Sequence, residues 1–259
     1  MNINDKNFLY PGDVVLWSGA WGTEEYKKAK VKSITVVKPG TKYGDEVGSL
    51  HWNFVRKRDC LIDLTHRCSL ECPACQRQMY YKGEYGNKVP GIDLPLESIE
   101  MILNNFQNVS LGGQLSDPIH YPHFIEVLKM CKDRDTGVKI QTASSHKPES
   151  FFMKAFETYD KADWQFGLDG LPSESHKYRK NQDGEKLFKI MCEGAKILRR
   201  KPIWQYIVFN YNEDHIEEAK QMAKDNNLQF VLMKSSRWLK GFTDHLMPSK
   251  KYRLDSTYD

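Results

Sequence analysis

The sequence lacks any apolar run close to the roughly 20 residues that a helix needs to span a bilayer. Its first ten residues, MNINDKNFLY, lack the basic segment and apolar stretch of a signal peptide. Its six cysteines show no paired pattern, which is typical of a reducing compartment where thiols stay free for metal. We therefore expect a cytoplasmic protein without a membrane segment.

The chain also lacks a strong excess of charge of either sign. Its formal net charge is +4 over 259 residues, which permits an anionic substrate but does not indicate a dedicated nucleic-acid-binding protein. A hydrophobic content of 40%, with 12% aromatic residues, excludes disorder of the whole chain. This length suits one large domain, alone or with a small appendage.

The most informative stretch, CLIDLTHRCSLECPACQRQ, covers residues 60–78 and contains three closely spaced cysteines. Cys68, Cys72 and Cys75 follow a short apolar segment on a polar loop, so their thiolates can converge and bind a soft metal. A structural zinc or an ordinary ferredoxin cluster takes four protein ligands, and no fourth cysteine lies nearby. Two sites remain open: an iron–sulfur cluster with one free iron, or a zinc ion completed by His66 or a more distant histidine.

From residue 60 onward, strand-like and helix-like segments alternate. The expected strands are 61–64, 109–112, 138–143, 164–168, 203–209 and 230–233, and the expected helices are 96–106, 123–132, 149–158, 185–199 and 213–225. Strands separated by helices at this interval form βαβ units and a parallel sheet. The fold class we predict is α/β, an open or partial (β/α)6 barrel with its chemistry at the carboxyl ends of the strands, where the cysteine loop lies.

The regions on either side of this barrel differ from it in pattern. Short strands at 12–17, 29–37 and 45–52 predict a small β-rich module over residues 1–58, for which an SH3-like barrel is one candidate. The barrel would then cover 59–235, followed by a tail over 236–259 that carries several basic residues. We expect that tail either to be solvated or to fold over the mouth of the barrel, where it could position an anionic substrate.

The cysteine spacing on a loop after the first strand resembles the radical S-adenosylmethionine (radical SAM) enzymes. The resemblance implies that Cys68, Cys72 and Cys75 hold a [4Fe-4S] cluster whose open iron chelates S-adenosylmethionine. An electron from a flavodoxin or ferredoxin type of reductant then cleaves the sulfonium to a 5′-deoxyadenosyl radical. One departure is Ala74, because the family usually has an aromatic residue before the last cysteine.

Later motifs resemble the same family and imply further cofactor contacts. Gly112, Gly113 and Asp117 resemble its glycine-rich turn and acid, which hold the amino group of the methionine moiety. Asp169 and Arg179 resemble its fourth-strand motif, in which the acid faces the active cavity and the arginine pairs with the methionine carboxylate. In addition, the resemblance implies that Ser144 contacts the ribose, that Asn210 contacts the cofactor or the substrate, and that Met233 contacts the adenine. Gly167 occupies a place where the family often has a ribose-binding serine.

The sequence leaves the substrate open between a peptide or protein and a nucleotide or RNA. Two alternatives to such an enzyme remain at this point. One is a zinc-stapled nucleic-acid-binding module without catalysis. The other is an activase of a glycyl-radical enzyme, which would share the cysteine spacing.

Overall fold

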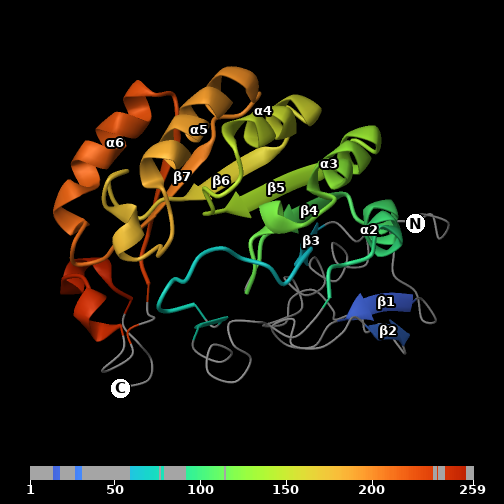
Figure 1. The fold of residues 1–259 in the computed structure, drawn as a ribbon, viewed down its shortest axis with the longest axis horizontal. Helices are drawn as coiled ribbons and strands as arrows, with labels where there is room; N and C mark the ends of the chain where they lie inside the picture. Colours follow the sequence, from blue (N-terminus) through green and yellow to red (C-terminus); the bar gives the residue numbers. More distant parts are fainter. Residues whose placement is uncertain are drawn as a thin grey trace, which may run out of the picture.

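The computed structural model describes residues 14–17, 27–30, 59–75, 77–78, 92–113, 115–235, 238 and 243–254. Its centre is a six-stranded sheet in which every neighbouring pair is parallel and the strand order follows the chain (Figure 1). The strands are β3 (Asp59–Ile62), β4 (Asn108–Leu111), β5 (Gly137–Thr142), β6 (Asp163–Gly167), β7 (Ile203–Ile207) and β8 (Gln229–Met233). This sheet confirms the predicted partial barrel, and each strand overlaps the segment expected from the sequence.

Helices connect these strands and cover one face of the sheet, as the row from α2 to α6 in Figure 1 shows. They are α2 (Leu96–Asn105), α3 (Phe124–Asp133), α4 (Glu149–Thr158), α5 (Gly184–Ile197) and α6 (Ile216–Asp225). The largest difference from the sequence concerns the start of α6. Glu213–His215 form a separate 3₁₀ turn, η5, before the α-helix begins.

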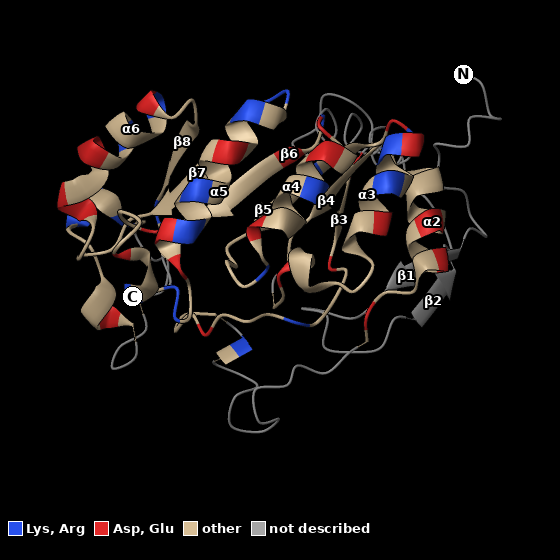
Figure 2. Cartoon of the chain, turned by 45° about the horizontal axis from the view of Figure 1, so that its top comes forward, with Lys and Arg blue, Asp and Glu red and all other residues tan. Residues whose placement is uncertain are grey.

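The helices dock through apolar faces and leave their charges outside. In α4, Phe152, Ala155 and Phe156 are buried, and in α5 Leu187 and Ile190 are buried, so both helices turn a stripe at helical spacing toward the sheet. Figure 2 shows lysine, arginine and acidic residues along the outer surfaces of α3 to α6. Burial of these apolar stripes is the main force that holds the helices on the sheet.

Aromatic side chains fill the core between β6 and α4. Trp164 is 1% exposed, and its ring lies 4.9 Å from Phe156 in an edge-to-face arrangement and 5.7 Å from Phe166 in a stacked one. Phe124 of α3 also meets the edge of Trp164, at 6.0 Å. Such pairs stabilise the core by about 0.5–1.5 kcal/mol each beyond the area they bury. They fix the position of β6, which ends at the candidate site.

The N-terminal module is described only in part. β1 (Val14–Trp17) and β2 (Lys27–Lys30) form an antiparallel pair and overlap the first two strands predicted there. The third predicted strand, 45–52, lies outside the described residues, so the SH3-like architecture and the domain boundaries stay predictions.

The described part of the C-terminal tail packs against the carboxyl ends of the last strands. Its two 3₁₀ turns are η6 (Asp244–Leu246) and η7 (Lys250–Tyr252), and Arg253 forms a parallel bridge with Ser235 just after β8. The backbone N–H of Ser249 donates to Glu213 Oε2 at 2.8 Å. Of the basic residues predicted to lie in this tail, Arg237 and Lys240 fall outside the described residues.

Among the helices of the described ranges, none combines the length and the apolar character needed to cross a bilayer.

Candidate functional site

The cysteine loop and the carboxyl ends of the strands enclose one cavity of about 360 Å³. All three predicted ligands, Cys68, Cys72 and Cys75, line it. The opposite wall carries side chains of the strand ends, among them Asp117, Gln141, Gln165, Arg179, Gln205 and Met233. The loop lies at this edge because it follows β3 directly, and in a parallel sheet the carboxyl ends of all strands meet at one edge.

Backbone hydrogen bonds hold the cysteine loop in place. Cys75 N donates to Cys72 O at 3.0 Å, which closes a turn between these two cysteines. Leu70 N donates to Cys68 Sγ at 3.4 Å, a contact that favours a thiolate. Glu71 N donates to Lys180 O at 3.2 Å, which anchors the loop to the segment after β6.

A small polar cluster adds a second anchor. Ser69 Oγ lies 2.8 Å from Ser144 Oγ and 3.0 Å from His120 Nε2, and that nitrogen lies 3.0 Å from Ser144 Oγ. These side chains come from the loop itself and from the segments after β4 and β5. They fix the residue next to Cys68 relative to both strands.

The thiols lie where a bare thiolate is unfavourable. Burial, with a smaller contribution from the charge of Asp117, raises the pKa of Cys68 to about 12. Burial raises the pKa of Cys72 to about 11, although the Arg179 guanidinium beside it acts in the opposite direction. A bound metal centre supplies the positive charge that such thiolates need, because a coordinating thiol is deprotonated outright.

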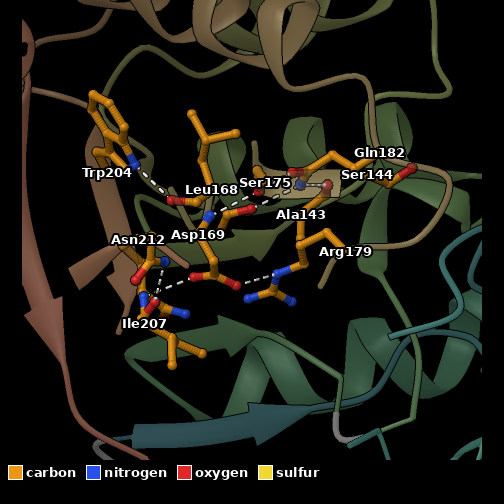
Figure 3. A network of polar contacts seen from close by, with 12 residues as sticks. Ala143, Ser144, Leu168, Asp169, Ser175, Arg179, Gln182, Trp204, Ile207 and Asn212 are labelled. Carbon is orange, nitrogen blue, oxygen red and sulfur yellow. Dashed lines mark hydrogen bonds and ion pairs between the residues drawn. The ribbon is translucent and has the colours of Figure 1, made fainter. Parts of the chain in front are cut away.

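Arg179 and Asp169 form a buried ion pair beside the cysteines, and Figure 3 shows Asp169 between Arg179 and Ile207. Arg179 Nε donates to Asp169 Oδ2 at 2.7 Å, and Ile207 N donates to Asp169 Oδ1 at 2.8 Å. Asp169 is fully buried, and the side chain of Arg179 is 16% exposed. Burial by itself would lower the pKa of Arg179, but the neighbouring Asp169 and Cys72 have the larger, opposite effect. The pKa of Arg179 is therefore raised above its usual value, and the guanidinium stays charged. Asp169 is therefore the partner that the structure gives to the arginine predicted to bind the methionine carboxylate.

Gly167 makes room for that arginine. A Cβ atom at this position would lie 2.8 Å from Arg179 Nη2 and 3.3 Å from Ala143 Cβ. The space above the end of β6 is thus occupied by a guanidinium. A serine side chain at position 167 would displace the guanidinium from Asp169.

Close packing of neighbouring side chains also explains why glycine occupies the two positions after β4. A Cβ atom at Gly112 would collide with Gln141 Oε1, and one at Gly113 would collide with Ser116 and approach Asp63 Oδ1 at 2.7 Å. Gly113 lines the cavity, whereas the side of Gly112 is covered by Gln141. Both glycines thus give room to neighbouring side chains of the protein, and their contact with a cofactor stays a prediction.

Asp117 lines the cavity, but its oxygens already accept bonds from the protein. Thr142 Oγ1 donates to Oδ1 at 2.8 Å, and Ala143 N and Ser144 N donate to Oδ2 at 2.9 and 3.1 Å. Ile119 N donates to Oδ1 at 3.3 Å. The carboxylate thus ties the loop after β4 to the end of β5, and an ammonium group would have to share its oxygens with these donors.

The remaining predicted contacts divide between the cavity and other places. Met233 lines the cavity and is 40% exposed. Ser144 is buried in the cluster with Ser69 and does not line the cavity. Asn210 does not line it either: its Nδ2 donates to His245 O at 2.7 Å, so its amide holds the C-terminal tail. The structure therefore does not bring Ser144 and Asn210 to the cavity as it stands.

Sequence reasoning missed several residues that form the cavity wall. The rings of Tyr178 and Phe209 pack in a tilted arrangement beside the cysteine loop, with their centroids 4.3 Å apart. Gln141, Gln165 and Gln205 form a row on three adjacent strands. A glutamine within each of three successive strand-like segments was a detectable signal. The aromatic pair had none, because its members lie 31 positions apart in different loops.

Among the described residues, no group of three His, Cys, Asp or Glu side chains is gathered closely enough to hold a metal ion. In a cubane cluster each thiolate binds its own iron, so the three sulfurs need not meet at one atom. The common cavity, the N–H bond to Cys68 and the cation beside Cys72 fit such a cluster. The identity of the metal stays a prediction.

No protein-family model and no curated protein matches this chain. Among solved structures it is similar to Streptococcus suis SuiB bound to S-adenosylmethionine, with a TM-score of 0.58 at 14% identity over 80% of this chain and 49% of SuiB. SuiB bound to the precursor peptide SuiA gives 0.56 at 15% identity over 78% of this chain and 47% of SuiB. Methylornithine synthase, PylB, gives 0.51 at 17% identity over 83% of this chain and 66% of PylB.

The chain thus spans about half the length of the SuiB chains it matches. At these identities the likeness establishes the fold. Over about four fifths of its length the chain has the fold of SuiB and PylB, which confirms the partial barrel predicted from its sequence.

Proposed function

We propose that this chain is a radical SAM enzyme. The observation that carries the proposal is that Cys68, Cys72 and Cys75 line one cavity at the carboxyl edge of a partial barrel. When bound there, a [4Fe-4S] cluster and S-adenosylmethionine would supply a 5′-deoxyadenosyl radical able to abstract hydrogen from an unactivated C–H bond. The electron would come from a flavodoxin or ferredoxin type of partner.

The chain's own residues would hold, orient and shield these groups. Three thiolates would bind three irons and leave the fourth open to the cofactor. The Arg179 guanidinium, kept charged by Asp169, places a fixed cation beside Cys72. Tyr178 and Phe209 pack against the loop and limit the access of water to the cavity.

For the substrate we propose a peptide rather than a nucleotide or RNA. The support is the likeness to SuiB, which binds a precursor peptide, together with a cavity wall that carries the three neutral polar side chains Gln141, Gln165 and Gln205. That a peptide is also the substrate of this chain is our proposal.

Anaerobic reconstitution with iron and sulfide, followed by dithionite and S-adenosylmethionine, tests the enzymatic proposal. We expect about four irons per chain and formation of 5′-deoxyadenosine. Cys72→Ala should lose both. Cys192→Ala is the matched control, because Cys192 lies on α5 and outside the residues that line the cavity, and it should behave as the unaltered chain.

Two results would contradict the proposal. One is colourless protein with one zinc ion per chain after purification without oxygen, which would favour the zinc-stapled module. The other is a chain with a full complement of iron and sulfide that forms no 5′-deoxyadenosine.

A further inference from the structure

Three glutamine side chains form a continuous row across the cavity wall. Gln141 on β5, Gln165 on β6 and Gln205 on β7 all line the cavity together with the cysteines. Gln141 Nε2 lies 3.5 Å from Gln165 Oε1, and Gln165 Nε2 donates to Gln205 Oε1. Gln141 and Gln165 are direct partners in the β5–β6 register. We call this row the carboxamide ladder.

The ladder leaves one oxygen and one nitrogen atom without a bond. Its two bonds occupy both polar atoms of Gln165 but only one atom each of Gln141 and Gln205. Within the described part of the chain, Gln141 Oε1 and Gln205 Nε2 have no other hydrogen-bond partner. Turning all three carboxamides over would only exchange the two ends. Both residues line the cavity, so these two end atoms can bond to a ligand there.

The charges around the cavity favour a neutral ligand for this wall over a strongly ionic one. Asp117 already accepts bonds from four protein groups, and Arg179 is neutralised by Asp169. Lys234 lies at the exposed rim, where its Nζ donates to Lys251 O at 2.8 Å. Lys234 also lines the cavity and has no acidic partner among the described residues, so a phosphate or carboxylate on the ladder would meet one uncompensated cation, at the rim. A neutral group with both a donor and an acceptor fits better.

The width of the ladder determines how long this group must be. Adjacent strands lie about 4.8 Å apart, so β5 and β7 are separated by roughly 10 Å. One amide or one nucleobase is too short to reach both ends. An extended peptide rises about 3.3 Å per residue, so about three residues cover the distance and present an N–H and a C=O at its ends.

We propose that the carboxamide ladder binds the backbone of an extended substrate segment of about three residues, across β5, β6 and β7. This inference rests on the proposed function and specifies how its peptide substrate is recognised. Recognition through backbone groups makes binding weakly dependent on the side chains of the peptide. It also positions a backbone segment in the cavity that the three cysteines line.

Saturation-transfer NMR with N-acetyl-trialanine amide as the probe, on reconstituted protein with S-adenosylmethionine present, tests this inference. Gln205→Met removes the free donor and keeps the size of the side chain, so the probe should bind about 3- to 10-fold more weakly, the effect of one lost hydrogen bond. Gln205→Glu, which replaces the donor with an acceptor, should weaken binding at least as much. Gln221→Met is the control, because this glutamine lies on the outer surface of α6 and bonds only to Asp225.

Unchanged probe affinity in Gln205→Met and Gln205→Glu, with circular dichroism melting as in the unaltered chain, would overturn the inference. Adenosine binding as tightly as the tripeptide would assign the wall to nucleosides instead. Tighter binding of the probe when S-adenosylmethionine is left out would assign the wall to the cofactor.

The probe measurement does not depend on cofactor cleavage, so the two proposals can fail separately. Glutamine-dependent binding without 5′-deoxyadenosine formation would retain the ladder and refute the enzymatic proposal. Formation of 5′-deoxyadenosine with glutamine-independent binding would do the reverse.

Discussion

Removal of Arg179 by the substitution Arg179→Met should destabilise the fold strongly. The side chain of Asp169 is fully buried, and among the described residues its carboxylate accepts hydrogen bonds from Arg179 Nε and from the Ile207 N–H. In Arg179→Met only the bond from the Ile207 N–H would remain. Breaking a buried pair by removing one partner costs about 3–5 kcal/mol, because an uncompensated charge is left in a medium of low polarity. For a domain of this size that corresponds to a decrease of roughly 6–20 °C in the melting temperature.

The chain contains a matched control for this substitution. Arg199 donates from Nε to Asp160 Oδ2 at 2.7 Å, the same atoms and distance as in the pair of Arg179 and Asp169, but both side chains are largely exposed. Arg199→Met should therefore change the melting temperature little, since solvent screens an exposed pair. Circular dichroism melting of both variants in the same buffer measures the difference that burial makes.

A second substitution separates the lost charge pair from lost packing. If the uncompensated carboxylate causes the damage, adding Asp169→Asn to Arg179→Met should restore part of the melting temperature, because a neutral amide is far less costly to bury. Equal losses in Arg179→Met and Arg199→Met, or a double variant no more stable than Arg179→Met, would refute this reasoning.

Two further predictions concern other buried groups. Trp204 Nε1 donates to Leu168 O at 2.7 Å, whereas Trp164 Nε1 has no partner among the described residues. Trp204→Phe should therefore lower the free energy of unfolding by about 1–2 kcal/mol more than Trp164→Phe. Equal losses of unfolding free energy, measured by urea denaturation, would contradict this. Burial raises the pKa of Glu174, but hydrogen bonds, the strongest from His215, outweigh it and leave that pKa below its usual range. A carboxyl group whose pKa is lower in the folded state than in the unfolded state stabilises the fold at pH values above its unfolded-state pKa. This stabilisation is lost as the pH falls through the folded-state pKa, so in Glu174→Gln the free energy of unfolding should depend less steeply on pH on the acid side. An unchanged pH dependence in Glu174→Gln would contradict this prediction.

The order of the elements could be read from the sequence because the signals are local. Apolar residues at helical spacing predicted α4 with the bounds that the structure shows, and acidic first turns such as that of Glu97 supported the helix starts. The cysteine loop was equally accessible, since Cys68, Cys72 and Cys75 lie within eight positions and depend only on the turn between them. The parallel order of strands followed from the length of the connections between them.

Polar partnerships over long separations needed the tertiary structure. The sequence could propose Arg179 for a cofactor carboxylate, but only the folded loop after β6 shows that Asp169 takes its Nε and that Gly167 provides the space. In the same way, Asn210 could be predicted at a strand end, yet the tail that uses its amide comes 35 positions later.

By itself, the sequence determined which residue types occur at each strand end and at what spacing the thiols follow β3. The tertiary structure decided which of those residues face each other. Gln165 bonds to glutamines 24 and 40 positions away, and both contacts depend on the register of β5, β6 and β7. That register is set by burial of the opposite face of the sheet under the helices, where a slip of one residue would exchange every inward and outward side chain.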